Sequence, residues 1–131
     1  MIRVVLVVLA VAVIAWCVDG IAATRAQDQL AALVANTAHP GPAALRRGEA
    51  LAARAQRRSF DRRALLLLAT LQLKAGDAAA AERVLKHAVA LQPDDGESWQ
   101  LLADAAHGRD PALERRALQR VRELAPPVPP P

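Results

Sequence analysis

Alanine and leucine recur along most of the chain at intervals of three and four residues, the spacing that lines one face of an α-helix. Glycine, proline and aspartate interrupt this pattern, so it divides into several short helices. Helices are expected over residues 19–36, 43–59, 64–73, 96–107 and 112–124, with one more around Leu85. Strands favour branched and aromatic side chains, whereas alanine dominates here and aromatic residues make up 2% of the chain. The sequence therefore predicts an all-α protein.

The amino-terminal segment has a different pattern, because residues 1–18 (MIRVVLVVLAVAVIAWCV) are apolar except for Arg3. A membrane-spanning helix needs about 20 apolar residues, and residues 20–23 supply the missing turn. Arg3 can remain among lipid headgroups, and Trp16 suits the opposite interface. We expect residues 1–23 to form a transmembrane signal anchor.

Two other fates of this segment remain open. A cleaved secretory signal would use Gly20-Ile21-Ala22 as its cleavage motif, although the basic start is short and a helical pattern continues through the cut. A lipoprotein would carry its lipid on Cys17, but Trp16 stands where that motif requires a small residue.

The orientation of the anchor follows from flanking positive charge. Arg3 precedes the segment, and Arg25 is the only basic residue in roughly the twenty that follow. This distribution favours an amino terminus in the cytoplasm and a domain on the other side of the inner (cytoplasmic) membrane. Nearly all positive residues are arginine, which together with the alanine content indicates a GC-rich bacterial genome, so the domain would be periplasmic or extracytoplasmic.

Two segments connect or end the helical pattern. Residues 24–42 comprise a helix, read either as a stalk or as a docking helix, and a linker in which Pro40 and Pro42 stop it. Residues 126–131 (PPVPPP) predict an extended, disordered polyproline tail.

The central stretch, residues 62–95, reads RRALLLLATLQLKAGDAAAAERVLKHAVALQPDD. It resembles a tetratricopeptide repeat (TPR), a helix–turn–helix unit of about 34 residues. The residues that carry the resemblance are Leu65, Leu68, Ala69, Gly76, Ala81, Leu85, Ala88 and Pro93. Gln72 departs from it, since the family prefers a large residue there. The resemblance implies a short α-solenoid of helical hairpins that serves as a scaffold.

Flanking segments match parts of further repeats, which gives a TPR-like domain over residues 43–125. A shift of 33 residues places three small residues, Gly48, Ala52 and Ala55, at second-helix positions of a preceding unit. In the following unit the matching residues are Trp99, Leu102, Ala103, Leu118 and Val121. Because about three repeats are needed for stability, the chain is expected to recruit its amino-terminal helix, form a homo-oligomer or dock on a partner.

The resemblance also implies a concave groove that binds a protein partner. The groove positions correspond to Arg63, Leu66, Thr70, Leu73, Gln100, Asp104 and His107. Leu66 and Leu73 are apolar, so either the amino-terminal helix or a partner is expected to cover them. The first reading of function is therefore a membrane-anchored adaptor in a bacterial envelope assembly.

An alternative function rests on a run of arginines: Arg46, Arg47, Arg54, Arg57, Arg58 and Arg62. Such a face could contact anionic headgroups beside the anchor, or nucleic acid. Nucleic-acid binding is disfavoured because Lys and Arg number 17 against 13 Asp and Glu, and no aromatic residues are interleaved to stack bases.

No pattern in the chain indicates chemistry. Asp104 and His107 share a helix face, but no third or fourth metal ligand accompanies them, and structural zinc uses four. Ser59, Ser98 and Cys17 lack a neighbouring base, and no glycine-rich phosphate loop occurs. We expect no enzymatic activity, no cofactor and no metal.

Overall fold

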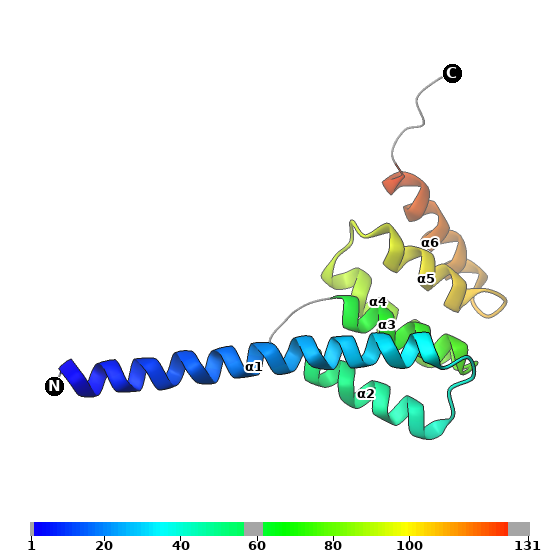
Figure 1. The fold of residues 1–131 in the computed structure, drawn as a ribbon. Helices are drawn as coiled ribbons and strands as arrows, with labels where there is room; N and C mark the ends of the chain where they lie inside the picture. Colours follow the sequence, from blue (N-terminus) through cyan, green and yellow to red (C-terminus); the bar gives the residue numbers. More distant parts are fainter. Residues whose placement is uncertain (1, 57–61, 126–131) are drawn as a thin grey trace, which may run out of the picture.

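The computed structural model describes residues 2–56 and 62–125, except that the side chains of residues 2–12, 14 and 16–19 are not described. All secondary structure in these ranges is helical, as the sequence predicts (Figure 1). The helices are α1 (Ile2–Asn36), α2 (Pro42–Gln56), α3 (Arg62–Lys74), α4 (Ala78–Leu91), α5 (Gly96–Ala106) and α6 (Pro111–Leu124).

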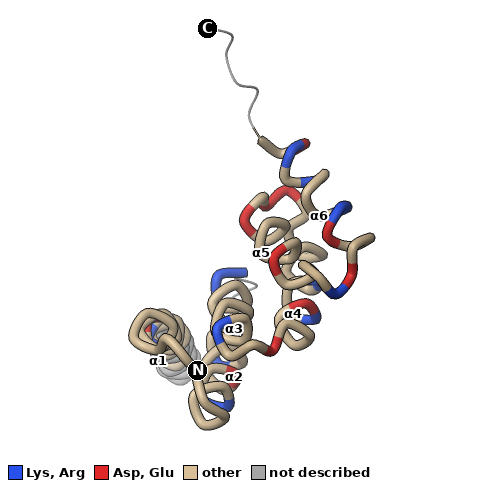
Figure 2. Tube along the Cα trace, turned by 90° about the vertical axis from the view of Figure 1, so that its right-hand side faces the viewer, with Lys and Arg blue, Asp and Glu red and all other residues tan. Residues whose placement is uncertain are grey.

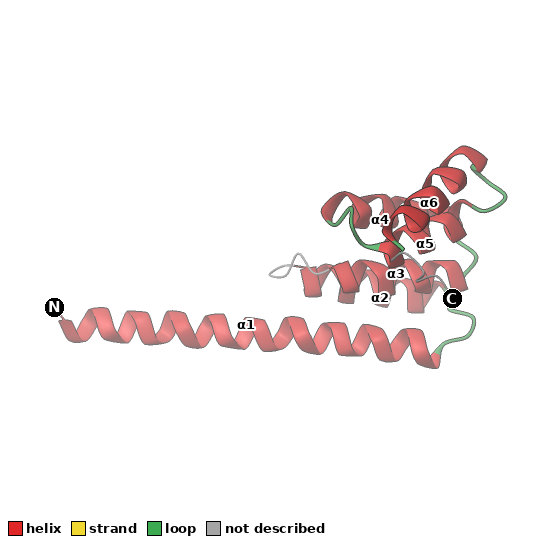
Figure 3. Cartoon of the chain, turned by 90° about the horizontal axis from the view of Figure 1, so that it is seen from above, coloured by secondary structure: helices red, strands yellow, loops and turns green. Residues whose placement is uncertain are grey.

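The helices pair in chain order into stacked antiparallel hairpins. α1 packs on α2, α3 on α4, and α5 on α6, and each hairpin also contacts the next (Figures 1 and 3). The odd-numbered helices of successive hairpins touch one another as well, α1 against α3 and α3 against α5. This is the layered arrangement of a helical repeat array, in which each unit covers the apolar face of its neighbour.

The first helix has two parts with different surroundings. Its carboxyl-terminal half lies against α2 and α3, where Ala26, Leu30 and Val34 are buried. Its amino-terminal half projects beyond the other helices (Figure 1). The sequence left two alternatives for residues 24–42, a stalk or a docking helix, and the structure shows a docking helix. No helical stretch among the described side chains is long and apolar enough to cross a membrane.

A lysine from the third helix holds the end of the first. Lys74 Nζ donates hydrogen bonds to the carbonyl oxygens of Val34, at 2.6 Å, and Thr37, at 3.4 Å. The last carbonyls of a helix have no partner within it and carry partial negative charge, so a cation there supplies both missing bonds and favourable electrostatics. α1 is thereby fixed to α3 by polar contacts as well as by apolar packing.

The second helix approaches its neighbours most closely at Gly48. A Cβ atom at this position would lie 2.4 Å from Leu71 Cδ2 and 3.6 Å from Leu30 Cδ1. Leu30 and Leu71 are both fully buried. The absence of a side chain at Gly48 therefore lets α2 sit against α1 and α3 together, as the small residues at this position predict.

Aspartates cap the amino-terminal ends of α4, α5 and α6, and glycines close two of the turns before these helices. Asp77, Asp95 and Asp110 each cap a following helix by accepting a backbone N–H, with Asp95 Oδ2 receiving that of Ser98 at 2.9 Å. Gly76 and Gly108 adopt φ values of 81° and 69°, a left-handed conformation that closes each turn cheaply only without a Cβ. The turns fall where glycine and aspartate interrupt the helical pattern of the sequence.

Two apolar clusters hold the array together, and α3 belongs to both. One cluster joins α1, α2 and α3 around Leu30, Leu51 and Leu68. The other joins α3, α4, α5 and α6 around Leu85 and Leu102. The sequence of α3 is apolar almost all the way round because this helix packs in both clusters.

Candidate protein-binding surface

The side of the array where α3 and α5 lie next to each other carries the residues that the repeat pattern assigned to a groove. The structure buries one of them: Leu66 is 6% exposed and packs in the cluster with Ala69, Leu85 and Leu102. Leu73 is half-buried against the same cluster. Leu66 is therefore covered within the chain, but the amino-terminal helix does not supply the cover. The C-terminal cluster, which contains no α1 residue, covers Leu66 because α5 packs directly on α3.

A recess remains open on this side. It has a volume of about 390 Å³ and is lined by Arg62, Arg63, Leu66, Leu67, Thr70 and Glu97. Thr70 Oγ1 donates a hydrogen bond to the carbonyl oxygen of Leu66 at 2.8 Å, which holds the hydroxyl close to its own helix. The recess thus combines an apolar floor with a basic rim from α3 and an acidic residue from α5.

Charge differs across the two helices that border this recess. The charged residues of α3 are all basic, whereas α5 and the two residues before it carry only acidic ones (Figure 2). Gln100 Nε2 donates to Asp104 Oδ1 at 3.3 Å, and both side chains are exposed. A partner lying here would meet opposite charge on its two sides, which fixes the direction in which it binds.

His107 lies at the end of α5 and pairs with the next helix. Its Nδ1 lies 2.9 Å from Glu114 Oε1. This hydrogen bond, with the charge of Glu114, raises the pKa of His107 above its ordinary value. Within the part of the chain that the structure describes, no three His, Cys, Asp or Glu side chains gather as metal ligands. His107 therefore joins α5 to α6 at the edge of the surface.

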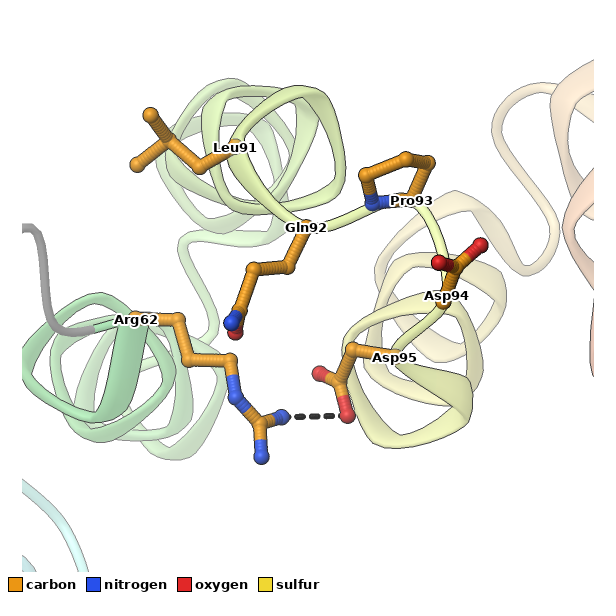
Figure 4. A pocket seen from close by; sticks show the side chains of 6 residues that line it. All are labelled: Arg62, Leu91, Gln92, Pro93, Asp94 and Asp95. Carbon is orange, nitrogen blue, oxygen red and sulfur yellow. Dashed lines mark ion pairs between the residues drawn. The ribbon is translucent and has the colours of Figure 1, made fainter.

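Arg62 connects α3 to the start of α5 and is not a free basic residue. Its guanidinium forms an ion pair with Asp95, beside a recess of about 370 Å³ that Gln92 and Pro93 also line (Figure 4). Burial raises the pKa of Asp95, but hydrogen bonds from Ser98 and Arg62 outweigh it, so this pKa lies below its ordinary value. The Asp95 carboxylate therefore both caps α5 and links it to α3 through Arg62.

The carbonyl of Pro93, the proline that closes the central unit, contacts side chains of α5 and α6. Trp99 Nε1 donates a hydrogen bond to the carbonyl oxygen of Pro93 at 2.8 Å. The guanidinium of Arg120, from α6, lies 6.0 Å from the centre of the Trp99 ring and 3.5 Å, through Nη2, from the same carbonyl. Sequence spacing placed Trp99 in the core, but no local signal pointed to Arg120.

The arginines of the alternative reading have different surroundings in the structure. Arg62 is paired, as described above, and Arg57 and Arg58 lie outside the described residues. Arg46 and Arg47 are exposed near the start of α2, and Arg54 is exposed near its end. The set therefore stays a prediction, in which Arg62 is already engaged by Asp95, and Arg47 and Arg54, seven residues apart, lie on one side of α2.

Comparison with known families agrees with this geometry. Residues 62–105 match the model of the tetratricopeptide repeat family, which covers α3, α4 and nearly all of α5. Over these residues the chain is similar to a tetratricopeptide repeat. No curated protein and no solved structure matches the chain. Repeats of this class present a surface to protein partners, so the class defined here is an interaction scaffold.

Proposed function

We propose that this chain is a membrane-anchored scaffold that holds a second protein against α3 and α5 as part of a bacterial envelope assembly. The recess bordered by Arg63 and Thr70 on one side and Glu97 on the other carries the proposal. It lies between two helices that also pack on α4 and α6, and it combines apolar residues with opposite charges. This combination suits a protein segment, because apolar contact supplies affinity and the charges supply orientation.

The proposed ligand is a peptide segment of the partner with one apolar and one basic residue. The apolar side chain would rest on Leu67, which is half-buried at the floor of the recess. The basic side chain would face Glu97 and Asp104, which are exposed on α5. No catalytic step is part of this proposal.

The membrane anchor in this proposal rests on sequence and shape. Residues 2–18 are apolar apart from Arg3, and the helix that contains them projects beyond the array (Figure 1). A continuous helix would transmit the orientation of the anchor to the array without a hinge. The proposed location is the inner membrane, with the array on the extracytoplasmic side because Arg3 precedes the apolar run.

Site-specific photo-crosslinking in intact cells tests the partner surface. A photo-reactive residue is placed at Gln100 or Asp104, on the proposed surface, and at His87 as a control on the exposed side of α4. The proposal predicts one shared crosslinked protein from the two α5 positions and none from His87. Equal crosslinking from all three positions, or none from α5, would contradict it.

A charge reversal separates binding from folding. Asp104→Arg places a repulsive charge on the proposed surface, and Arg83→Glu reverses an exposed charge on α4. The first substitution is expected to remove the crosslink made from Gln100, with unchanged helical circular dichroism, and the second to leave it. Leu66 is unsuitable for this purpose, since it is buried and its substitution would test folding.

Extraction of cell membranes tests the anchor. The full chain is expected to stay with the membrane after an alkaline wash, whereas a chain starting at residue 20 is released. Release of both forms by the same wash would contradict the anchor and leave the partner surface unaffected.

A further inference from the structure

A second recess lies between α1 and α2, at the end of the array where α1 leaves it. Its volume is about 380 Å³, and its lining residues are Ile21, Ala22, Arg25, Ala26, Gln29 and Arg54. The residues from α1 are spaced three and four apart, so they occupy one face of that helix. Arg54 comes from the last turn of α2, which runs antiparallel to α1. Two guanidinium groups therefore face one opening from two helices.

No described carboxylate is paired with the two arginines of this recess. Arg25 and Arg54 make no ion pair with any other described residue, whereas Arg62, Arg109 and Arg120 each have a carboxylate partner. None of the lining residues is acidic. Gln29 adds an amide that can donate a further hydrogen bond. Two unpaired guanidinium groups and an amide are the donors that bind a phosphate group, because arginine engages its oxygens in a bidentate manner.

The position of the recess along α1 relates it to the apolar run. From Val18 to Arg25 the helix rises about 10 Å, at about 1.5 Å per residue. The headgroup layer on each side of a bilayer is roughly 5 to 8 Å thick. Side chains on a helix lean toward its amino terminus, so the Arg25 guanidinium extends back toward the apolar run and into this layer.

An exposed apolar residue lies between the run and the arginines. Ile21 is 53% exposed at the edge of the charged recess. At a membrane surface the same side chain would contact the boundary between headgroups and acyl chains. The apolar side chain would contact the start of the acyl chains of a phospholipid, and the cationic groups would contact its phosphate.

We infer that the recess lined by Ile21, Arg25, Gln29 and Arg54 binds the phosphate of an anionic phospholipid headgroup. This inference rests on the membrane anchor of the proposed function. Bound lipid would join α1 to the end of α2 and give the array a second attachment point on the bilayer. The array would then hold one orientation relative to the membrane, with the α3–α5 surface presented to partners in a fixed direction.

Native mass spectrometry of the full chain released from lipid nanodiscs tests the inference. The discs contain equal amounts of phosphatidylcholine and phosphatidylglycerol, and the ratio of retained lipids is measured. Each basic residue near an anionic surface contributes about 1 kcal/mol, so the two arginines predict a preference for phosphatidylglycerol of about 30-fold. The variant Arg25→Gln with Arg54→Gln is expected to lose this preference.

A matched variant controls for net charge. Arg46→Gln with Arg47→Gln removes the same charge from the other end of α2, about 10 Å farther along that helix. It is expected to retain the lipid preference of the wild type. Equal loss in both double variants would overturn the inference, since it would show a response to overall charge. Far-ultraviolet circular dichroism confirms that both variants keep their helices.

The remaining outcomes separate the inference from the anchor. Insertion into the discs without a preference for phosphatidylglycerol overturns the lipid site and leaves the anchor intact. Failure of the wild type to insert contradicts the anchor of the proposed function, and the lipid site with it. Inorganic phosphate is added in a separate arm, and displacement of the retained lipid by millimolar phosphate would show that the site recognises free phosphate, which also overturns the inference.

Discussion

Among the glycines, Gly48 is the one where an added Cβ would lie within 4 Å of other described groups, so Gly48→Ala should change the stability of the fold. A Cβ at this site would lie 2.4 Å from Leu71 Cδ2. Carbon atoms in good contact are roughly 3.5 Å apart, so Leu71 or the backbone of α2 must move by about 1.1 Å. Leu71 is fully buried, and Leu30 Cδ1 and Leu68 Cδ1 also lie near the added carbon, at 3.6 and 3.8 Å. The added carbon would therefore enter a part of the core that three leucines already fill.

Two opposing energies set the outcome of Gly48→Ala. Alanine is favoured over glycine within a helix by about 1 kcal/mol. Overpacking of a well-filled core costs about 1 to 3 kcal/mol. We expect the free energy of unfolding to fall by up to about 2 kcal/mol, measured by urea denaturation of the full chain in mild detergent and followed by circular dichroism.

A second substitution isolates the clash. Leu71→Val removes the atom that the new Cβ would meet and itself loses about 0.8 kcal/mol for one methylene. In this background Gly48→Ala is expected to stabilise the protein by about 1 kcal/mol, because only the helix preference remains. The reasoning is refuted if Gly48→Ala raises stability by the same amount in both backgrounds, since the two positions would then be uncoupled.

Three further substitutions test individual contacts. Lys74→Met removes the bonds to the end of α1 and should accelerate hydrogen exchange in its last turn, while unchanged exchange would show that Lys74 does not hold it. Gln72 is 4% exposed, and no described residue hydrogen-bonds its Oε1, so the isosteric Gln72→Met should raise the urea midpoint by the equivalent of about 1 kcal/mol. A lower midpoint would reveal a partner. Glu114→Gln should lower the pKa of His107 toward its ordinary value in an NMR titration, and an unchanged pKa would contradict the pairing. In the wild type the raised pKa of His107 stabilises the fold below the unfolded-state pKa, and this contribution disappears as the pH rises through the folded-state pKa.

Local chemistry made part of this structure predictable from the sequence. Gly76 and Asp95 mark a turn and a cap through their own backbone and side-chain preferences, and neither needs information from distant residues. The small residue at Gly48 likewise indicates a close helix approach whatever its neighbours are. These features depend on a few adjacent residues, which a sequence displays directly.

Other features depend on residues far apart in the chain. Lys74 reaches a carbonyl 40 residues earlier, and Arg120 one 27 residues earlier, and neither distance leaves a periodic signal. Leu66 occupies a position that lies in the groove in this family, but the packing of α5 on α3 covers it. The burial of Leu66 and the pairing of Arg62 therefore required the three-dimensional structure.

The docking of α1 could not be decided from its sequence. Ala26, Leu30 and Val34 are four residues apart and buried on one face, but they follow an apolar run that has no polar face for contrast. A stalk and a docking helix therefore give the same pattern. In the structure α1 supplies the first helix of the first hairpin, which brings the described array to three hairpins.

The most direct test of this arrangement compares two shortened chains, residues 20–131 and residues 37–131, by urea denaturation. Both lack the apolar run, and they differ only in the part of α1 that packs against α2 and α3. Burying Leu30 and Val34 contributes about 1.5 to 3 kcal/mol each, so the shorter chain is predicted to lose at least about 3 kcal/mol of unfolding free energy. Equal urea midpoints for the two chains would contradict the claim that α1 completes the array.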